Sequence, residues 1–153
     1  MIKTLLATLA AAALVIPAQA EPIKESEYKT MHSMGCMLLG ECTDGVEKVY
    51  SMLDISSQYD NTEEYTGVTG EFHNMLHSLN LVGVNVFLAD EKYFPKGHRG
   101  VYHTVSNNFF LNKNFMGSPG TLMMVMRHEG WHAAQDCMAG TIDNSLIAII
   151  KPE

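Results

Sequence analysis

The segment 118–140 constrains the fold of this chain most, because it carries the signals of one long helix. Ser118 and Pro119 give a hydroxyl N-cap followed by proline in the first turn, the preferred order at a helix start. Gly140 stands where glycine commonly ends a helix. We therefore predict a helix of about 20 residues, Pro119 to Ala139, against which the rest of the domain must pack.

Within this helix, residues 128–132 read His-Glu-Gly-Trp-His. Histidines four positions apart lie on one helix face, so His128 and His132 can both reach one metal ion. Glu129 lies roughly 100° further around the helix, where it can hold a metal-bound water without ligating the metal. This H-E-x-x-H arrangement predicts a site for one zinc ion.

Three helices are expected before the strands. Asp44, followed three residues later by Glu47, resembles a capping box that opens the second of them. Gly67 and Gly70 weaken the third, which follows a turn at 57–61. The expected bounds of the three helices are 26–39, 44–56 and 62–79.

The hydrophobic period then changes from helix to strand. Residues 81–89 are rich in β-branched side chains, and a second strand is expected over 101–111, after a loop at 90–100. That second strand carries a kink or bulge at 106–108. The apolar residues that alternate on one face of the first strand are Val82, Val84, Val86 and Leu88. This order predicts an α+β domain, with helices packed on a small antiparallel sheet.

The part of the chain from Leu81 to Gly140 resembles the zincin metallopeptidases, which place a sheet directly before the active-site helix. The stretches that carry the resemblance run from Arg99 through Asn112 and from Arg127 to His132. The second stretch contains the H-E-x-x-H motif, and the first is a pattern of apolar and aromatic strand residues. The resemblance implies a strand–loop–helix unit in which the last strand borders the substrate cleft.

The resemblance further implies peptide or amide hydrolysis with one zinc ion as cofactor. Two neutral imidazoles hold zinc at about 2.0–2.1 Å, and zinc lowers the pKa of a bound water towards 7. Glu129 acts as the general base, taking the proton of that water and passing it to the leaving amine. The expected partner is a peptide or protein substrate, which can pair with the edge strand near 101–111.

The third protein ligand of the zinc is not settled by the motif. Asp143 is favoured, because the segment Gly140-Thr141-Ile142-Asp143 resembles a shortened form of the Gly-Thr-x-x-Asp element of aspzincins. Asp136 lies about 12 Å along the helix axis from His128, too far to close one tetrahedron. We expect Asp136 to orient His132 or to cap the helix, as carboxylates behind a metal site do.

Two further residues remain candidates for the third zinc ligand. Whether the chain is an active enzyme is also left open by the sequence. Glu153 has a gluzincin-like separation from His132, and Cys137 offers a thiolate, although it points away from the histidine stripe. A reading frame truncated after Glu153 would lack a ligand-bearing helix. The alternatives to a peptidase are a non-catalytic secreted domain of zincin fold, with structural zinc or none, and an amidase that acts on cell-wall peptides.

The first 20 residues predict a cleavable signal peptide. Lys3 forms a basic start, residues 5–16 are apolar, and Ala18-Gln19-Ala20 is a small-x-small cleavage site. This apolar run is too short to span a bilayer. We therefore expect a secreted or periplasmic protein with no membrane anchor after cleavage, folded as a single domain over 21–153.

Charge excludes some partners. Without Lys3, nine Lys and Arg residues face 17 Asp and Glu residues, a formal charge of −8. An acidic exported domain without basic clusters is a poor candidate for binding nucleic acid or an anionic membrane. The oligomeric state is not indicated.

Three cysteines permit one disulfide with three pairings: Cys36–Cys42, or either of these with Cys137. A bond to Cys137 would tie the N-terminal region to the motif helix. Because it closes a long loop, we expect it to stabilise the chain more, by about 3–5 kcal/mol.

The remaining histidines are weaker candidates. His73 and His77, close to Glu71, form a second pair with helical spacing, which is more typical of a polar helix face than of a second metal site. His98 and His103 lie near the expected cleft, where either could stabilise an oxyanion. No spacing selects one of them, and exposed polar side chains are the simpler interpretation.

Overall fold

A computed structural model describes residues 25–139 and 147–150, with side chains over 32–138. The signal peptide predicted for residues 1–20 lies outside the described residues. The elements in chain order are α2 (Glu25–Leu38), β1 (Val46–Lys48), α3 (Met52–Ser56), the 3-10 helix η1 (Thr62–Val68), α4 (Thr69–Leu81), β2 (Asn85–Ala89), the 3-10 helix η2 (Glu91–Tyr93), β3 (Gly100–His103), β4 (Asn108–Asn112), α5 (Pro119–Ala139) and β5 (Ile147–Ile150).

The five strands form one mixed sheet in the order β1-β2-β4-β3-β5. β1 pairs antiparallel with β2, and β3 pairs antiparallel with both β4 and β5. β2 and β4 pair in parallel, which needs the connection through η2 and β3. The predicted α+β class is confirmed, whereas the prediction of a purely antiparallel sheet was wrong at this pair.

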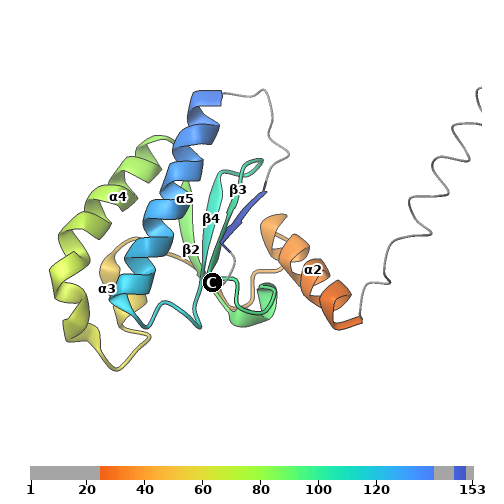
Figure 1. Cartoon of the computed structure of the whole chain (residues 1–153), viewed down its shortest axis with the longest axis horizontal. Coiled ribbons are helices and arrows are strands. Elements are labelled where there is room, and N and C mark those ends of the chain that lie inside the picture. The colour runs from red at the N-terminus through yellow and green to blue at the C-terminus, as the bar shows by residue number, and fades with distance from the viewer. Residues whose placement is uncertain (1–24, 140–146, 151–153) are drawn as a thin grey trace, which may run out of the picture.

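Helices cover both faces of the sheet, with α4 and α5 on one side and α2 on the other (Figure 1). Strand residues alternate between the two cores, as the pleat requires. Towards α4 and α5 point Val86, Leu88, Tyr102, Phe109 and Leu111. Towards α2 and η2 point Ala89, Val101 and Phe110. α5 therefore lies across β3, and the buried side chains of α5 belong to the core between the sheet and the helices α4 and α5.

The strand predicted over 101–111 is a hairpin of β3 and β4 rather than one kinked strand. The predicted kink is the turn between them, where Asn107 has φ 56°. Asparagine is among the residues that adopt this left-handed conformation most readily. In β2, Val84, Val86 and Leu88 are buried as predicted, but the strand begins only at Asn85 and Val82 is exposed.

The helix predicted over 44–56 was wrong in its first half. Residues 46–48 form β1, and the short helix α3 begins only at Met52. Ser51, rather than Asp44, is the N-cap, and Asp54 completes the capping box by accepting hydrogen bonds from the amides of Tyr50 at 2.7 Å and Ser51 at 3.0 Å. The helix predicted over 62–79 divides into η1 and α4. The motif helix has the bounds that were predicted.

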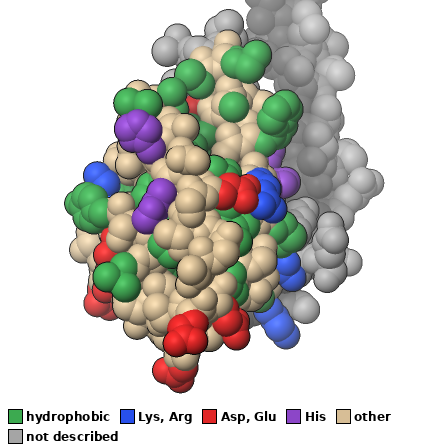
Figure 2. All heavy atoms as spheres, turned by 90° about the vertical axis from the view of Figure 1, so that its left-hand side faces the viewer, with side chains coloured by type: hydrophobic (Ala, Val, Ile, Leu, Met, Phe, Trp, Pro, Cys, Tyr) green, Lys and Arg blue, Asp and Glu red, His purple; other side chains and the backbone are tan. Residues whose placement is uncertain are grey.

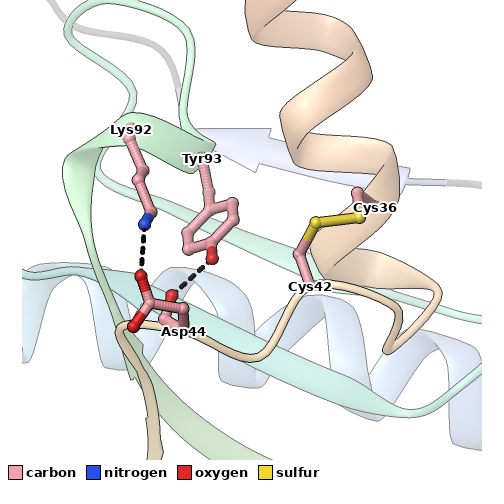
Figure 3. The surroundings of a disulfide bond; sticks show 5 residues. All are labelled: Cys36, Cys42, Asp44, Lys92 and Tyr93. Carbon is pink, nitrogen blue, oxygen red and sulfur yellow. Dashed lines mark hydrogen bonds and ion pairs between the residues drawn. A yellow bond between two sulfur atoms is a disulfide. The ribbon is translucent and has the colours of Figure 1, made fainter.

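A disulfide joins Cys36 at the end of α2 to Cys42 in the following loop (Figure 3). Cys137 is exposed and free. A bridge to Cys137 would have enclosed a longer loop, but the bond closes locally, where the turn after α2 brings two cysteines together. Of the three pairings that the sequence left open, the structure has Cys36–Cys42.

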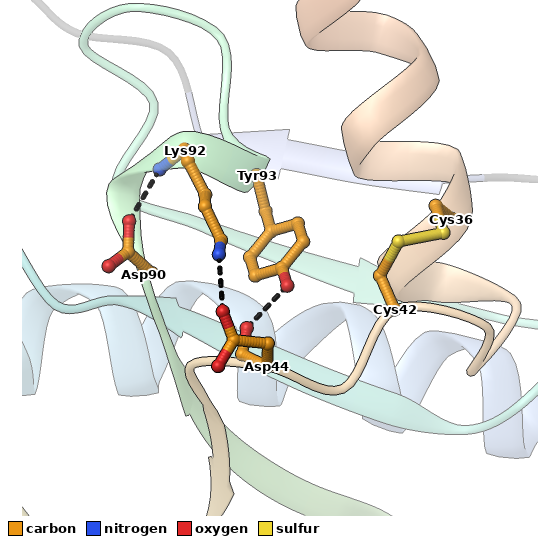
Figure 4. Close-up of polar contacts among 6 residues, drawn as sticks. All are labelled: Cys36, Cys42, Asp44, Asp90, Lys92 and Tyr93. Atoms are coloured by element: carbon orange, nitrogen blue, oxygen red, sulfur yellow. Dashed lines mark hydrogen bonds and ion pairs between the residues drawn. A yellow bond between two sulfur atoms is a disulfide. The ribbon is translucent and has the colours of Figure 1, made fainter.

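Next to the disulfide, a small polar cluster fixes η2 to the loop before β1 (Figures 3 and 4). The ammonium of Lys92 lies 2.8 Å from Oδ2 of Asp44, and the hydroxyl of Tyr93 donates to the Asp44 carbonyl oxygen. Oδ1 of Asp90 accepts the amide of Lys92 at 2.9 Å. Lys92 holds the pKa of Asp44 below its usual range through a hydrogen bond and charge attraction.

None of the helices within the described ranges is both long and apolar enough to span a bilayer.

Candidate functional site

The H-E-x-x-H motif lies in the middle of α5, as predicted. The start of the helix is fixed by Ser118, whose side-chain oxygen accepts the amide of Thr121 at 3.3 Å. Its carbonyl accepts the amide of Leu122 at 2.9 Å. The predicted N-cap is therefore present, and the spacing of four residues brings the two histidines to one face of the helix.

The two histidine rings meet at their outer nitrogens. Nε2 of His128 lies 3.0 Å from Nε2 of His132, and the rings are tilted edge to face. His128 is exposed and His132 is half-buried. Nδ1 of His132 lies 3.1 Å from Oε1 of Gln135. Partial burial and the neighbouring His132 ring both lower the pKa of His128, which favours its neutral form.

Glu129 is buried rather than open to solvent. Its exposed fraction is 0%, and neither of its carboxylate oxygens has a hydrogen-bond partner. Burial raises its pKa to about 8, so the group is mostly protonated at neutral pH in this conformation. A general base must reach its water, so the sequence pattern found the residue but not its burial.

Glu129 faces β3 at a point where strand and helix lie very close. A Cβ atom added at Gly100 would lie 2.7 Å from Cγ1 of Val125 and 3.8 Å from Cγ of Glu129. About two turns further along the helix, Oδ2 of Asp136 accepts a hydrogen bond from the hydroxyl of Tyr102 at 2.7 Å. Val125, Glu129 and Asp136 thus form the stripe of α5 that lies on β3.

The histidines lie to one side of this stripe, and α4 lies to the other. Successive helix residues are about 100° apart, so His128 and Gly130 flank Glu129 on opposite sides. Gly130 faces α4, since an added Cβ would lie 3.5 Å from Cε of Met75. α5 also contacts β3 and β5, which are the last two strands at one end of the sheet. The histidine pair therefore lies on the β5 side of the helix.

An open groove of about 520 Å³ lies between α4 and α5, on the side of α5 away from His128 and His132. Figure 2 shows this α4 side, where histidine side chains stand among hydrophobic and acidic groups. The bidentate ion pair of Arg127 with Glu71, at 2.8 and 2.9 Å, joins the two helices. No sequence signal indicated this pair, because 56 positions separate its partners. The groove is lined by Glu71, Asn74, Met75, Ser78, Leu79 and Gly130.

The side chain expected to orient His132 or to cap the helix, Asp136, instead accepts a hydrogen bond from Tyr102, and Gln135 is the residue that lies at Nδ1 of His132. Cys137 is exposed and is not grouped with the histidines. Asp143 and Glu153 lie outside the described residues. Across 25–139 and 147–150, no three His, Cys, Asp or Glu side chains form a group that could hold a metal ion.

The other histidines have structural contacts. Nε2 of His73 accepts the amide of Met52 at 3.0 Å and so caps the first turn of α3. A second metal site shared with His77 would compete with this bond. Nδ1 of His103 lies 2.7 Å from the Ser106 hydroxyl, and Nδ1 of His98 lies 3.2 Å from the Pro95 carbonyl oxygen. Burial lowers the pKa of His103, the one of these two that is buried.

The spacing of the two histidine nitrogens fits that of two ligands of one zinc ion. Two nitrogens at about 2.0–2.1 Å from a tetrahedral zinc lie about 3.3 Å apart, close to the 3.0 Å found here. The buried, unpartnered carboxyl of Glu129 is the second polar feature at this place that the fold itself does not satisfy. The two histidines therefore fit the ion in kind and spacing, and the third ligand stays a prediction.

Comparison of the chain with protein-family models, with curated proteins and with solved structures finds no match. The resemblance to zincins rests on the motif and the strands before it, and it stays a prediction.

Proposed function

We propose that this chain is an exported zinc-dependent hydrolase of peptide or amide bonds. The observation that carries the proposal is the approach of the His128 and His132 Nε2 atoms to 3.0 Å on one face of α5. Support also comes from the adjacent Glu129, a buried carboxyl that makes no hydrogen bond and raises rather than lowers the free energy of the fold.

His128 and His132 would hold the zinc ion through Nε2, with Asp143 as the favoured third ligand. Bound there, zinc supplies a Lewis acid for the substrate carbonyl and lowers the pKa of water. Gln135 orients the His132 ring through Nδ1, as partners of metal-binding histidines do. Glu129, ionised once water and the charge of the metal ion lower its pKa, would take a proton onto its carboxylate and return it to the leaving amine. This role requires water to reach a group that is fully buried in the free chain.

The burial of Glu129 also favours a second candidate, a non-catalytic domain that holds a metal ion through the same histidines. Such a domain needs no water at Glu129. It would show zinc-dependent melting without turnover of any peptide, whereas the hydrolase requires both.

The first experiment is zinc stoichiometry by mass spectrometry on the protein without residues 1–20. We expect one zinc per chain, lost in His132→Ala and weakened in Asp143→Ala. His77→Ala is the matched control, because it removes an exposed histidine of α4 and should change nothing. A parent protein without zinc would remove the proposal. Zinc unchanged in Asp143→Ala would remove Asp143 alone.

The second experiment separates the two candidates. Chelator-sensitive hydrolysis of a fluorogenic peptide library should disappear in Glu129→Gln, while the zinc content stays at one per chain. Retained activity in that variant would exclude Glu129 as the base. Full zinc content without turnover in the parent would favour the non-catalytic domain.

A further inference from the structure

The motif helix α5 exposes a row of large apolar side chains on its outer face. Trp131, the one tryptophan of the chain, is 65% exposed, and Met124 and Met138 are 42% and 88% exposed. Glu129 on the opposite side of the helix is fully buried, so the row faces away from the sheet. α4 packs beside α5 (Figure 1). Neighbouring exposed apolar side chains commonly mark an interaction surface.

The row is nearly straight because its members are seven residues apart. Two turns of a helix bring a residue back to within about 20° of its starting direction. Met124, Trp131 and Met138 therefore lie one above another along about 21 Å of helix. Trp131 stands in the middle, with a methionine seven positions before it and another seven positions after it. The row thus has the same composition in both directions along the helix.

The residues beside the row add almost no net charge. Among the exposed side chains from 124 to 138, only Arg127 comes from a Lys, Arg, Asp or Glu residue. Glu71 of α4 neutralises it through the bidentate ion pair. The two acidic residues of α5 lie elsewhere, since Glu129 is buried and Asp136 accepts the hydroxyl of Tyr102. This face is therefore close to neutral on a chain whose formal net charge is −7.

We propose that the outer face of α5 pairs with the same face of a second copy of this chain, antiparallel about a two-fold axis at Trp131. A two-fold interface must be complementary to itself. An axis at this point sets each residue against the one that lies equally far beyond Trp131 in the second copy. The two tryptophan rings then meet at the centre, and Met124 faces Met138 of the second copy.

The polar side chains favour the antiparallel over the parallel arrangement. In the antiparallel pair, Arg127 faces the side-chain amide of Gln135 of the second copy, which offers an acceptor oxygen. His128 faces Ala134, which is small enough to leave room for the ring. A parallel pair would set Arg127 against Arg127 and would also align the two helix dipoles, and both effects are repulsive.

The composition of the row sets the expected strength of the pair. A central tryptophan surrounded by weaker contacts is the usual make-up of a binding hot spot. Pairing along the row would bury on the order of 1,000 Å² in total, which is at the lower limit for a specific interface. We therefore expect a dissociation constant of roughly 1–100 μM. The inference goes beyond the proposed function, because the pair needs neither zinc nor substrate.

Sedimentation equilibrium of the protein without residues 1–20 tests the pairing, with a chelator present. The background is Cys137→Ser, so that the exposed thiol cannot cross-link two chains. We expect a reversible dimer, weakened at least about tenfold in Trp131→Ala. Leu53→Gln is the matched control, because Leu53 is equally exposed at 65% but lies on α3, and it should leave the association unchanged. Association of Trp131→Ala as strong as that of the parent would overturn the inference.

The antiparallel register has a test of its own. Met124→Lys and Met138→Glu should each weaken the association, because each puts a charge into the apolar row. The double variant Met124→Lys/Met138→Glu should associate more strongly than either single variant, because each introduced lysine meets a glutamate of the second copy. In a parallel pair the introduced charges would meet their own kind. A double variant weaker than both single variants would therefore overturn the antiparallel arrangement.

A measurement on the parent covers the case in which the variants fail to fold. Because Trp131 is the one tryptophan, its emission should shift to shorter wavelengths as the protein concentration rises through the dissociation constant. A monomer with constant emission up to about 1 mM would overturn the inference. A shift that appears only with phosphatidylcholine vesicles would assign the face to a membrane surface and would also overturn it. A failed zinc assay leaves these results standing, since they are obtained with a chelator.

Discussion

Two polar clusters on opposite faces of the sheet differ in how their groups are satisfied. Beside α2, the carboxylate of Asp44 is bound by Lys92 and its carbonyl by Tyr93 (Figure 4). Under α5, both carboxylate oxygens of Glu129 are buried without a partner. In the first cluster the Lys92–Asp44 ion pair is solvent-exposed, whereas a buried polar group without a hydrogen bond lowers the stability of the fold.

The difference shows which of the two clusters has a structural role in the fold. The Asp44 cluster fixes η2 beside the disulfide and has a structural role in every contact. Glu129 makes no hydrogen bond within the described residues. It is adjacent in sequence to His128, whose Nε2 lies 3.0 Å from Nε2 of His132. Buried groups with raised or lowered pKa values gather at functional sites. The contrast supports the proposal that α5 carries the functional site, while the contacts on the α2 side stabilise the fold.

The strongest test of the contrast is the pH dependence of unfolding in the presence of a chelator. The pKa of Glu129 rises from 4.5 to about 8 on folding, so the folded state binds the proton more tightly than the unfolded state. Its stabilising contribution is complete below pH 4.5 and is lost as the pH rises to about 8, at about 1.4 kcal/mol per unit. Urea unfolding from pH 5 to pH 9 should reveal a total loss of roughly 4 kcal/mol.

Glu129→Gln is the control for that experiment, because it keeps the shape and removes the titration. The difference in unfolding free energy between parent and variant should grow with pH and flatten above pH 8. A difference that stays constant from pH 5 to pH 9 would show that the carboxyl is ionised or solvated in the folded protein, and the contrast between the clusters would fail.

The next largest effect is expected where β3 crosses α5. Gly100→Ala places a Cβ 2.7 Å from Cγ1 of Val125 and 3.2 Å from the Phe110 carbonyl oxygen, which should cost up to about 3 kcal/mol through overpacking. Gly70→Ala is the matched control, since no atom lies within 4 Å of its added Cβ and α4 gains a better helix former. Urea midpoints of both variants give the comparison.

Val125→Ala tests the cause of the Gly100 effect. If the clash with Val125 is responsible, the double variant Gly100→Ala/Val125→Ala should be more stable than the two single losses added together. Simple additivity would instead place the strain at the Phe110 backbone.

Local signals predicted the parts of the fold that depend on local chemistry. The sequence signals at Ser118, Pro119 and Gly140 predicted the bounds of α5, because helix caps act within one turn. The Asp44 and Glu47 pattern failed for the opposite reason: Asp44 is bound by Lys92, 48 positions away, and that pairing was not visible in a local window. The hairpin between β3 and β4 was missed because a turn and a bulge carry the same polar residues.

For the site, the sequence located the residues but not their surroundings. Spacing four predicted that His128 and His132 meet, and they do. That Glu129 would be buried depends on β3 approaching α5 at Gly100, a contact between distant residues. Likewise, the bond of Asp136 to Tyr102 depends on the hairpin register. The favoured ligand Asp143 lies outside the described residues, so its role stays a prediction.

On the α2 side, the disulfide should contribute most. It closes a loop between residues six positions apart, for which chain entropy predicts about 2 kcal/mol. The variant Cys36→Ser/Cys42→Ser should lower the unfolding free energy by that amount, while Cys137→Ser should change it by less than about 0.5 kcal/mol. A larger effect from Cys137→Ser would mean that the free thiol, and not the bridge, stabilises the chain.

The smallest effects are expected in the Asp44 cluster itself, where burial and exposure can be compared directly. Tyr93 is buried and donates to the Asp44 carbonyl, so Tyr93→Phe should cost about 1 kcal/mol at any salt concentration. The Lys92–Asp44 pair is solvent-exposed, and Lys92→Met should cost less than Tyr93→Phe, with the loss shrinking towards zero in 1 M NaCl because salt screens exposed charges. Melting curves at low and high salt separate the two. A loss in Lys92→Met that persisted at high salt would show that the ion pair is shielded from water, and the exposed cluster would then resemble the buried one more than its contacts indicate.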